Sequence, residues 1–345
     1  MNTVKKGLAV FIKIKVAPLL LLMIIVVLFF FGMRPSYLGS SNVLIILKSA
    51  SITGLLGIGV GMLLISGEVD LATSSVSVIS SVIVAMLLSA GLPWPLAVLG
   101  TLLFGALSGL AVSLLVNKLN MMSFIATIGV SSVWQGLALV ITRSNPVKFN
   151  SEAFLKIGST AVGYDQEHKL LPLMFIIMVV LIIAYGLILS HTKFGRSIYM
   201  CGGNRNAARL AGIDPQKIHT VLFINCGAIA SLAGVFIASN FRKGDPTPRT
   251  EGLDAITAAV LGGILFTGGA GGTGGLLVGL MLLSFFNNGI IAVGLKNYWQ
   301  IFARGALLIL ALLFDYYREK QRLKMLMRAP PATQKLQDST GARSG

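Results

Sequence analysis

Apolar runs of helical length alternate with short polar or glycine-containing breaks along most of the chain, from Val16 to Phe314. A helix that crosses the hydrocarbon core of a bilayer needs about 20 mostly apolar residues. We therefore expect membrane-spanning helices near residues 16–31, 43–66, 71–89, 97–116, 121–141, 171–190, 219–239, 253–267, 276–293 and 299–315. The pattern predicts an all-α polytopic membrane protein with about ten transmembrane helices.

Composition supports this class. Hydrophobic residues make up 55% of the chain and charged residues 12%, whereas soluble domains average about 25% charged residues. The first apolar run ends in Phe31-Gly32-Met33-Arg34-Pro35, without the small residues of a signal-peptide cleavage site, so we expect a retained first helix. We assign residues 1–317 to one transmembrane domain and residues 318–345 to a basic tail that we expect to be disordered.

The basic residues predict an orientation. If the N-terminus lies in the cytoplasm, inside segments hold 17 lysines and arginines and outside loops hold nine, which is the bias of the positive-inside rule. Both termini and the segment 191–218 are then cytoplasmic, and the loop 142–170 is outside. The net charge of +16 is not accompanied by a basic helix or an aromatic-basic platform, so we expect no nucleic-acid partner. The basic tail fits contact with anionic lipid.

Two segments resemble each other. Asp, Thr and Val coincide when residues 69–76 are aligned with residues 253–260. In the predicted topology Asp70 lies at the inside face and Asp254 at the outside face, which is typical of an inverted-topology repeat. Chance similarity between two N-capped helices is the alternative, because aspartate is a favoured N-cap residue. Either way, we expect both aspartates to cap helices.

The sequence carries no recognisable catalytic or metal site. It contains no G-x-x-x-x-G-K-[ST] loop, no G-x-S-x-G and no H-E-x-x-H. Residues 269–274 match G-x-G-x-x-G, but they lie between two apolar runs and predict a tight interhelical turn. Cys201 and Cys226 form no metal or disulfide pattern and are expected to be unpaired thiols.

Polar residues within the spans need partners, because an amide that faces lipid has none. Gln135, Asn287 and Asn288 are candidates for a transport path, with bonding between helices as the alternative for each. Arg304 either lines a cavity or extends toward the membrane surface. Glycine pairs four residues apart, at 57 and 61, 105 and 109, and 275 and 279, predict close helix packing.

Four blocks of residues resemble one family: Gly195-Arg196 through Gly202-Gly203-Asn204, Ala207-Ala208-Arg209 and Gly212-Ile213; residues 258–263; residues 286–289; and residues 67–71. They resemble the permease subunit of ATP-binding-cassette importers for simple sugars, in the ribose, xylose, galactose and autoinducer branch. The resemblance extends from the first span to Asp315. The chain departs from the family pattern at Ala72, Thr73, Ser74 and Ser75, where Ser and Gly-Ser are usual, and at Gln135, where Arg is common.

The resemblance implies an importer in a bacterial cytoplasmic (inner) membrane. It implies two permease subunits, identical or homologous, two cytoplasmic ATPases that use the ATP, and an extracytoplasmic solute-binding protein. It also implies that the inside segment couples the permease to the ATPase through Gly195, Arg196, Gly202, Gly203, Asn204, Ala208, Arg209 and Gly212. The chain itself is then not an enzyme and binds no cofactor.

The residues of this segment favour the same role. Helix-forming residues flanked by glycines predict a short amphipathic helix, with a positive φ at Gly203, and Arg196, Arg205 and Arg209 are available to a partner. Two other functions stay open. An ion-coupled carrier would need a buried carboxylate or histidine relay, and a membrane-embedded enzyme would need a catalytic constellation; neither is visible in the sequence.

Overall fold

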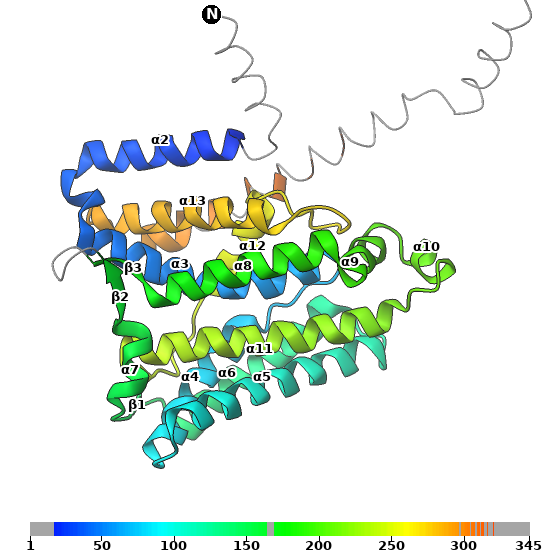
Figure 1. Cartoon of the computed structure of the whole chain (residues 1–345), viewed down its shortest axis with the longest axis horizontal. Helices are drawn as coiled ribbons and strands as arrows, with labels where there is room; N and C mark the ends of the chain where they lie inside the picture. Colours follow the sequence, from blue (N-terminus) through cyan, green and yellow to red (C-terminus); the bar gives the residue numbers. More distant parts are fainter. Residues whose placement is uncertain are drawn as a thin grey trace, which may run out of the picture.

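The computed structural model describes residues 17–163, 169–296, 298–303, 305–307, 309, 310, 312, 313, 316 and 320. Its long helices are α2 (Ala17–Met33), α3 (Ser40–Ile65), α4 (Thr73–Ser89), α5 (Trp94–Asn117), α6 (Ser123–Thr142), α8 (Leu173–His191), α11 (Pro215–Phe241) and α13 (Thr273–Ala292). The shorter helices are η1 (Pro35–Leu38), α7 (Glu152–Ser159), α9 (Lys193–Gly203), α10 (Arg205–Leu210) and α12 (Glu251–Leu261). The described residues therefore form a helical bundle (Figure 1).

Four short strands form two small antiparallel ladders. β1 (Val147–Lys148) pairs with β4 (Lys243–Gly244), and β2 (Ala161–Gly163) pairs with β3 (Lys169–Pro172). In Figure 1, β1 and β2 lie with α7 at one end of the bundle, while α9 and α10 lie at the other end. The prediction of an all-α membrane protein is confirmed, since helices make all the long elements of the described chain.

The expected count of ten spans is not confirmed. Among the described residues, six helices are long and apolar enough to cross a membrane: α3, α5, α6, α8, α11 and α13. The apolar helices α2 and α4 have 17 residues each. The span expected at 299–315 falls largely outside the described residues, as do Arg304 and, apart from Lys320, the tail 318–345.

The expected span at 253–267 is wrong as a continuous helix. α12 has 11 residues and is about 16 Å long at 1.5 Å per residue, roughly half of the hydrocarbon core. It ends at Leu261 with Gly262 as its C-cap, and Gly263, Gly268, Gly269 and Gly271 follow with positive φ angles. Glycine adopts these angles without the steric cost of a Cβ, so this stretch turns back toward α13. The turn predicted for residues 269–274 is confirmed in part, because the connection covers residues 262–272 and α13 already begins at Thr273.

α3 and α11 form the centre of the bundle, and most of their residues are buried. α5 lies closely along α11. A Cβ at Gly105 or Gly109 would overlap the backbone of α11, at Gly227 and Phe223 respectively. The tight packing predicted from these two glycines is confirmed, and it matches the close approach that small residues allow between membrane helices.

The helices α4 and α12 meet at their N-termini. The backbone N–H of Gly252, in the first turn of α12, donates to Ser74 Oγ in the first turn of α4 at 2.7 Å. Both helices follow chain without regular structure: residues 66–72 precede α4, and residues 245–250 precede α12. Irregular backbone at membrane depth is tolerated where protein covers it. In segment 66–72, Asp70 and Ala72 are buried, whereas most of segment 245–250 is exposed or half-buried.

Candidate functional site

The chain between α8 and α11 folds as the two short helices α9 and α10, which confirms the helix predicted in this segment. Asn204 begins α10, because its side-chain oxygen accepts the backbone N–H groups two and three residues later, each at 3.0 Å. Gly212, with a φ of 78°, ends it. The backbone N–H groups of Gly212 and Ile213 donate back to Arg209 and Ala208, which is the hydrogen-bond pattern of a glycine-terminated helix.

The other glycines of the segment act by their small size. A Cβ at Gly195 would overlap two carbonyl oxygens at the end of α8, and a Cβ at Gly202 would overlap the carbonyl oxygen of Ile65. The expectation for Gly203 was wrong. It is the last residue of α9, is not among the residues with positive φ, and an added Cβ would meet nothing within 4 Å. The close approach is made one residue earlier, at Gly202.

Three chain segments meet beside α9. The backbone N–H of Gly269 donates to the carbonyl of Ile65 at 2.8 Å. The Tyr199 hydroxyl donates to the carbonyl of Gly271 at 2.7 Å, and burial raises the pKa of that hydroxyl. The end of α3, the turn after α12 and the end of α9 are therefore held together by one main-chain hydrogen bond and one from the Tyr199 side chain.

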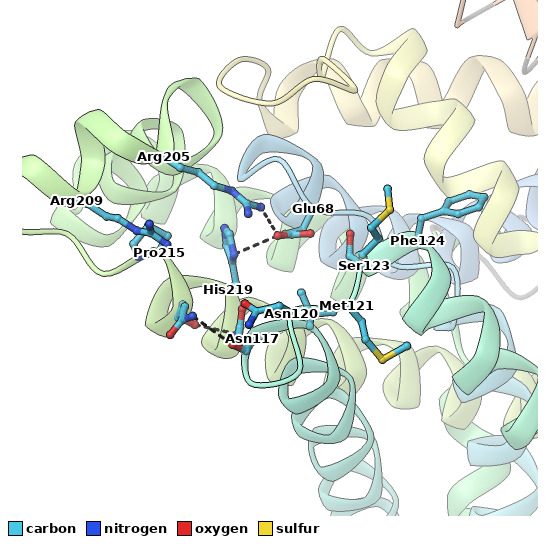
Figure 2. Close-up of a pocket in the computed structure, with 13 residues that line it drawn as sticks. Glu68, Asn117, Asn120, Met121, Ser123, Phe124, Arg205, Arg209, Pro215 and His219 are labelled. Carbon is cyan, nitrogen blue, oxygen red and sulfur yellow. Dashed lines mark hydrogen bonds and ion pairs between the residues drawn. The ribbon is translucent and has the colours of Figure 1, made fainter.

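Beside this contact, Glu68 carries a buried negative charge. The residue is 5% exposed. Its carboxylate forms an ion pair with Arg205 of α10 and lies 3.3 Å from His219 Nδ1 of α11. Figure 2 shows Arg205 and His219 pointing at the carboxylate from two different elements. A buried charge is tolerated when it is paired. Arg205 is therefore bound within the chain, although its side chain is 49% exposed, and the expectation that it also faces a partner stays a prediction.

A cavity of about 370 Å³ opens next to this ion pair. Its lining includes Glu68, Arg205, Arg209 and His219 on one side and the α5–α6 connection on the other (Figure 2). The amides of Asn117 and Gln216 in its wall are bonded to each other's backbone carbonyls, at 3.1 and 3.2 Å. The wall therefore combines hydrogen-bonded amides and two arginines with apolar side chains such as Met121 and Phe124.

The outer surface of α10 combines charge with an exposed leucine. Leu210 is 91% exposed, and Arg209 is exposed next to it, while Ala208 is buried against the bundle. Arg196 of α9 is also exposed. A single exposed leucine is ordinary on a protein surface, whereas arginine is enriched on surfaces that another protein covers.

The two aspartates predicted as caps hold different positions. Asp70 accepts the backbone N–H of Ala72 at 2.8 Å, and Ala72 is itself the N-cap residue of α4, so Asp70 orders the chain that leads into the helix. The expectation for Asp254 was wrong, because the N-cap residue of α12 is Thr250 and Asp254 lies inside its first turn. Both aspartates are buried.

The path candidates are separated in space from the α9–α10 site. Gln135 donates to the carbonyl of Pro246 at 2.7 Å, and Asn288 accepts from Asn42 of α3 at 2.8 Å. Bonding between chain segments, the alternative for each, is therefore what the structure shows for these two amides. Asn287 differs, because its buried side-chain oxygen has no hydrogen-bond partner among the described residues.

Replacing Asn288 by leucine should lower the stability of the subunit by about 1 kcal/mol, because the Asn42 amide then loses one of its two hydrogen bonds and keeps only the one to the Tyr37 carbonyl. Replacing Asn287 should cost less stability, since no bond to its oxygen is lost. Thermal unfolding of the detergent-solubilised subunit compares the two. Equal loss in both variants would contradict the bond between Asn42 and Asn288 as a stabilising contact.

Sequence reasoning gave no role to three residues of the site: Glu68, His219 and Leu210. A signal existed for Glu68, since it is an acidic residue between two apolar runs, on the same predicted side as the basic segment. No signal marked Leu210, because leucine is also the commonest buried residue of such a helix. Cys201 and Cys226 are buried and unpaired, as predicted.

Curated relatives cover most of the chain. It is 32% identical over 286 residues to the ribose import permease protein RbsC of Escherichia coli K12, covering 82% of this chain and 88% of that protein. It is 31% identical over 295 residues to the L-arabinose ABC transporter permease protein AraH of Azospirillum brasilense, covering 84% of each. It is 31% identical over 281 residues to the autoinducer 2 import system permease protein LsrC of Photorhabdus luminescens, covering 81% and 83%.

No solved structure matches the chain. The family described as the branched-chain amino acid transport system permease component matches residues 42–312. This range covers the long described helices from α3 onward, apart from the first two residues of α3, and it also covers α9 and α10. The chain therefore belongs to this family of transporter permeases, as the resemblance in its sequence indicated.

Proposed function

We propose that the chain is the membrane-spanning permease subunit of an ATP-driven, binding-protein-dependent importer of a simple sugar or a sugar-like solute. Relatives named as ribose, L-arabinose and autoinducer 2 permeases support the cargo class. The observation that carries the mechanism is the exposed surface of α10, where Leu210 stands open beside Arg209. The ATP is used by a separate ATPase subunit that covers this surface.

The orientation follows from the same surface. The ATPase is cytoplasmic, so α9, α10 and both chain termini lie on the cytoplasmic side of a bacterial inner membrane. The end that carries α7 and the small ladders then faces the solute-binding protein. A second permease subunit, identical or homologous, completes the membrane part. The excess of basic residues in the inside segments, 17 against nine, supports this orientation.

An inverted repeat accounts for the meeting of α4 and α12. Two helices that are related by inverted topology and begin within the membrane are a recurrent arrangement in transporters. The hydrogen bond between Gly252 and Ser74 joins the first turns of these helices, and the buried aspartates Asp70 and Asp254 come from the aligned segments. Asn287, with its unpartnered oxygen, stays our candidate for the solute path.

The structure does supply buried carboxylates, which an ion-coupled carrier requires. Glu68, Asp70 and Asp254 are all buried. Glu68 is paired with Arg205, and Asp70 accepts a backbone N–H, so these two are held by contacts that suit a fixed position. Uptake into vesicles that contain the ATPase, ATP and the solute-binding protein but no ion gradient distinguishes the two functions, because a secondary carrier stays inactive there.

A negative charge placed on the outer surface of α10 should weaken ATPase binding. Leu210→Glu and Arg209→Glu are each expected to weaken the complex on the order of 30-fold, the effect of removing one well-buried contact of about 2 kcal/mol from an interface. The measurement is a binding titration of purified permease against its ATPase. Lys156→Glu, which reverses a charge on α7 at the opposite end, is the matched control and should bind normally.

Normal binding by both α10 variants would place the ATPase contact elsewhere. Equal loss in the Lys156→Glu control would show that the measurement reports net charge and not a local contact.

A further inference from the structure

The helices α9 and α10 are attached to two segments of irregular chain, and each segment belongs to a helix that begins within the bundle. Segment 66–72 leads directly into α4, and the turn 262–272 directly follows α12. α4 and α12 also touch each other through the hydrogen bond from Gly252 to Ser74. A displacement of α9–α10 therefore reaches the α4–α12 pair along two routes.

The route through α12 uses one side-chain hydrogen bond and close main-chain packing. The Tyr199 hydroxyl donates to the carbonyl of Gly271, and a Cβ at Gly269 would lie 2.8 Å from the Cα of Gly203. A movement of α9 would therefore displace the turn directly. These contacts contain no charged group, so their strength depends on the hydrogen bond and on packing.

The route through α4 uses a charge. Glu68 lies two residues before Asp70, which orders the chain into α4. Its carboxylate is held by Arg205, the first residue of α10, and by His219 near the start of α11. Because Glu68 is 5% exposed and His219 is 2% exposed, separating the pair would leave a buried carboxylate without its counter-charge. The contact is therefore suited to persist while the helices move.

We propose that Glu68 is a positioning residue for transport: it fixes α10 to segment 66–72, so that ATPase-driven movement of α9–α10 moves α4 and, through the Gly252–Ser74 contact, α12. Glu68 touches neither the ATPase nor the solute in this role. The inference rests on the proposed function, because it says which part of the permease moves when the ATPase moves α9 and α10.

The consequence is a loss of coupling without a loss of docking. In vesicles that contain the permease with its ATPase and binding protein, Glu68→Gln should still bind the ATPase and still hydrolyse ATP. The number of solute molecules imported per ATP should fall about tenfold, within the usual range of coupling between two sites in one protein. A role in stability alone would lower the amount of assembled complex and would not change this ratio.

A second variant tests the same link from its other side. Arg205→Met removes the contact from a side chain that is 49% exposed but leaves the buried Glu68 carboxylate without its counter-charge. Its unfolding midpoint is therefore measured beside the ratio, and the ratio should fall as in Glu68→Gln. The double variant should be no worse than either single one, because both remove the same link. Lys217→Met is the control: it removes an exposed ion pair with Asp214, at 3.8 Å, and should leave the ratio unchanged.

The outcomes separate the inference from the proposed function. An unchanged ratio in both Glu68→Gln and Arg205→Met, with a coupled wild-type importer, overturns the inference and leaves the proposed function standing. Loss of ATPase binding in both variants also overturns it, because Arg205 and Glu68 would then form part of the docking surface. A wild-type chain that binds no ATPase overturns the proposed function and the inference together.

Discussion

Gly202→Ala is expected to separate the end of α9 from α3 and to abolish solute uptake, while Gly203→Ala should leave the fold intact. A Cβ at Gly202 would overlap the carbonyl oxygen of Ile65 and lie 2.6 Å from the amide nitrogen of Gly269. Both are main-chain atoms that already bond to each other, so they cannot move aside independently. Overpacking of this kind typically costs about 1–3 kcal/mol.

The measurement is the thermal unfolding of the detergent-solubilised subunit, followed by hydrogen exchange of the Gly269 amide. We expect the Gly269 amide to lose protection in Gly202→Ala, since its bond to Ile65 is displaced. Gly203→Ala is the matched control, one residue away in the same helix and with open space around its Cβ. Equal protection of the Gly269 amide in the two variants would mean that the contact is not made as described.

The sequence predicted most of the helices because apolar length is a strong signal. The boundaries of α5 and α6, for example, lie within three residues of the predicted spans. The prediction failed at α12, where an apolar run continues through Ile264-Leu265-Phe266 although the helix ends at Leu261. Two adjacent glycines decide the end of this helix, and hydrophobicity alone does not reveal them as a stop.

The α9–α10 segment could be predicted from its motif, but the reason for each glycine and the partner of Arg205 could not. The sequence indicated that glycines matter there, and conformational freedom was the natural explanation. That explanation holds at Gly212, where φ is positive. At Gly195 the reason is the close approach of the end of α8, six and seven residues earlier, and at Gly202 it is the approach of Ile65 and Gly269, which lie far away in the sequence and which no local pattern encodes. Arg205 likewise looked available to a partner, because its buried counter-ion lies 137 residues earlier.

The path residues show the same limit. An amide in an apolar helix must find a partner, and this requirement was correct for Gln135 and Asn288. Which partner it finds depends on tertiary packing. Gln135 reaches the chain between β4 and α12, and Asn288 reaches α3. Among the three path candidates, only Asn287 has a buried side-chain oxygen without a hydrogen-bond partner among the described residues. It is therefore the candidate that has a physical reason to contact solute.

Gly109→Val is expected to be the most destabilising single change in the bundle. A Cβ at Gly109 would overlap the carbonyl oxygen of Phe223 and lie 2.9 Å from the Cα of Ile224. These are backbone atoms of α11, so the two helices must move apart along their contact. Separation also exposes the contact at Gly105, four residues away on the same face, and removes van der Waals packing, which drives helix association within a membrane.

Gly129→Val on α6 is the matched control, because its Cβ would meet nothing within 4 Å. In a helix, replacing an exposed glycine changes stability by less than about 1 kcal/mol, whereas Gly109→Val should cost several times more, beyond the usual 1–3 kcal/mol for overpacking. Unfolding of the isolated subunit in detergent gives both values, and using the isolated subunit removes any contact that α6 makes with a partner. Similar midpoints for the two variants would show that α5 and α11 can separate at little cost, and the description of their contact would have to be abandoned.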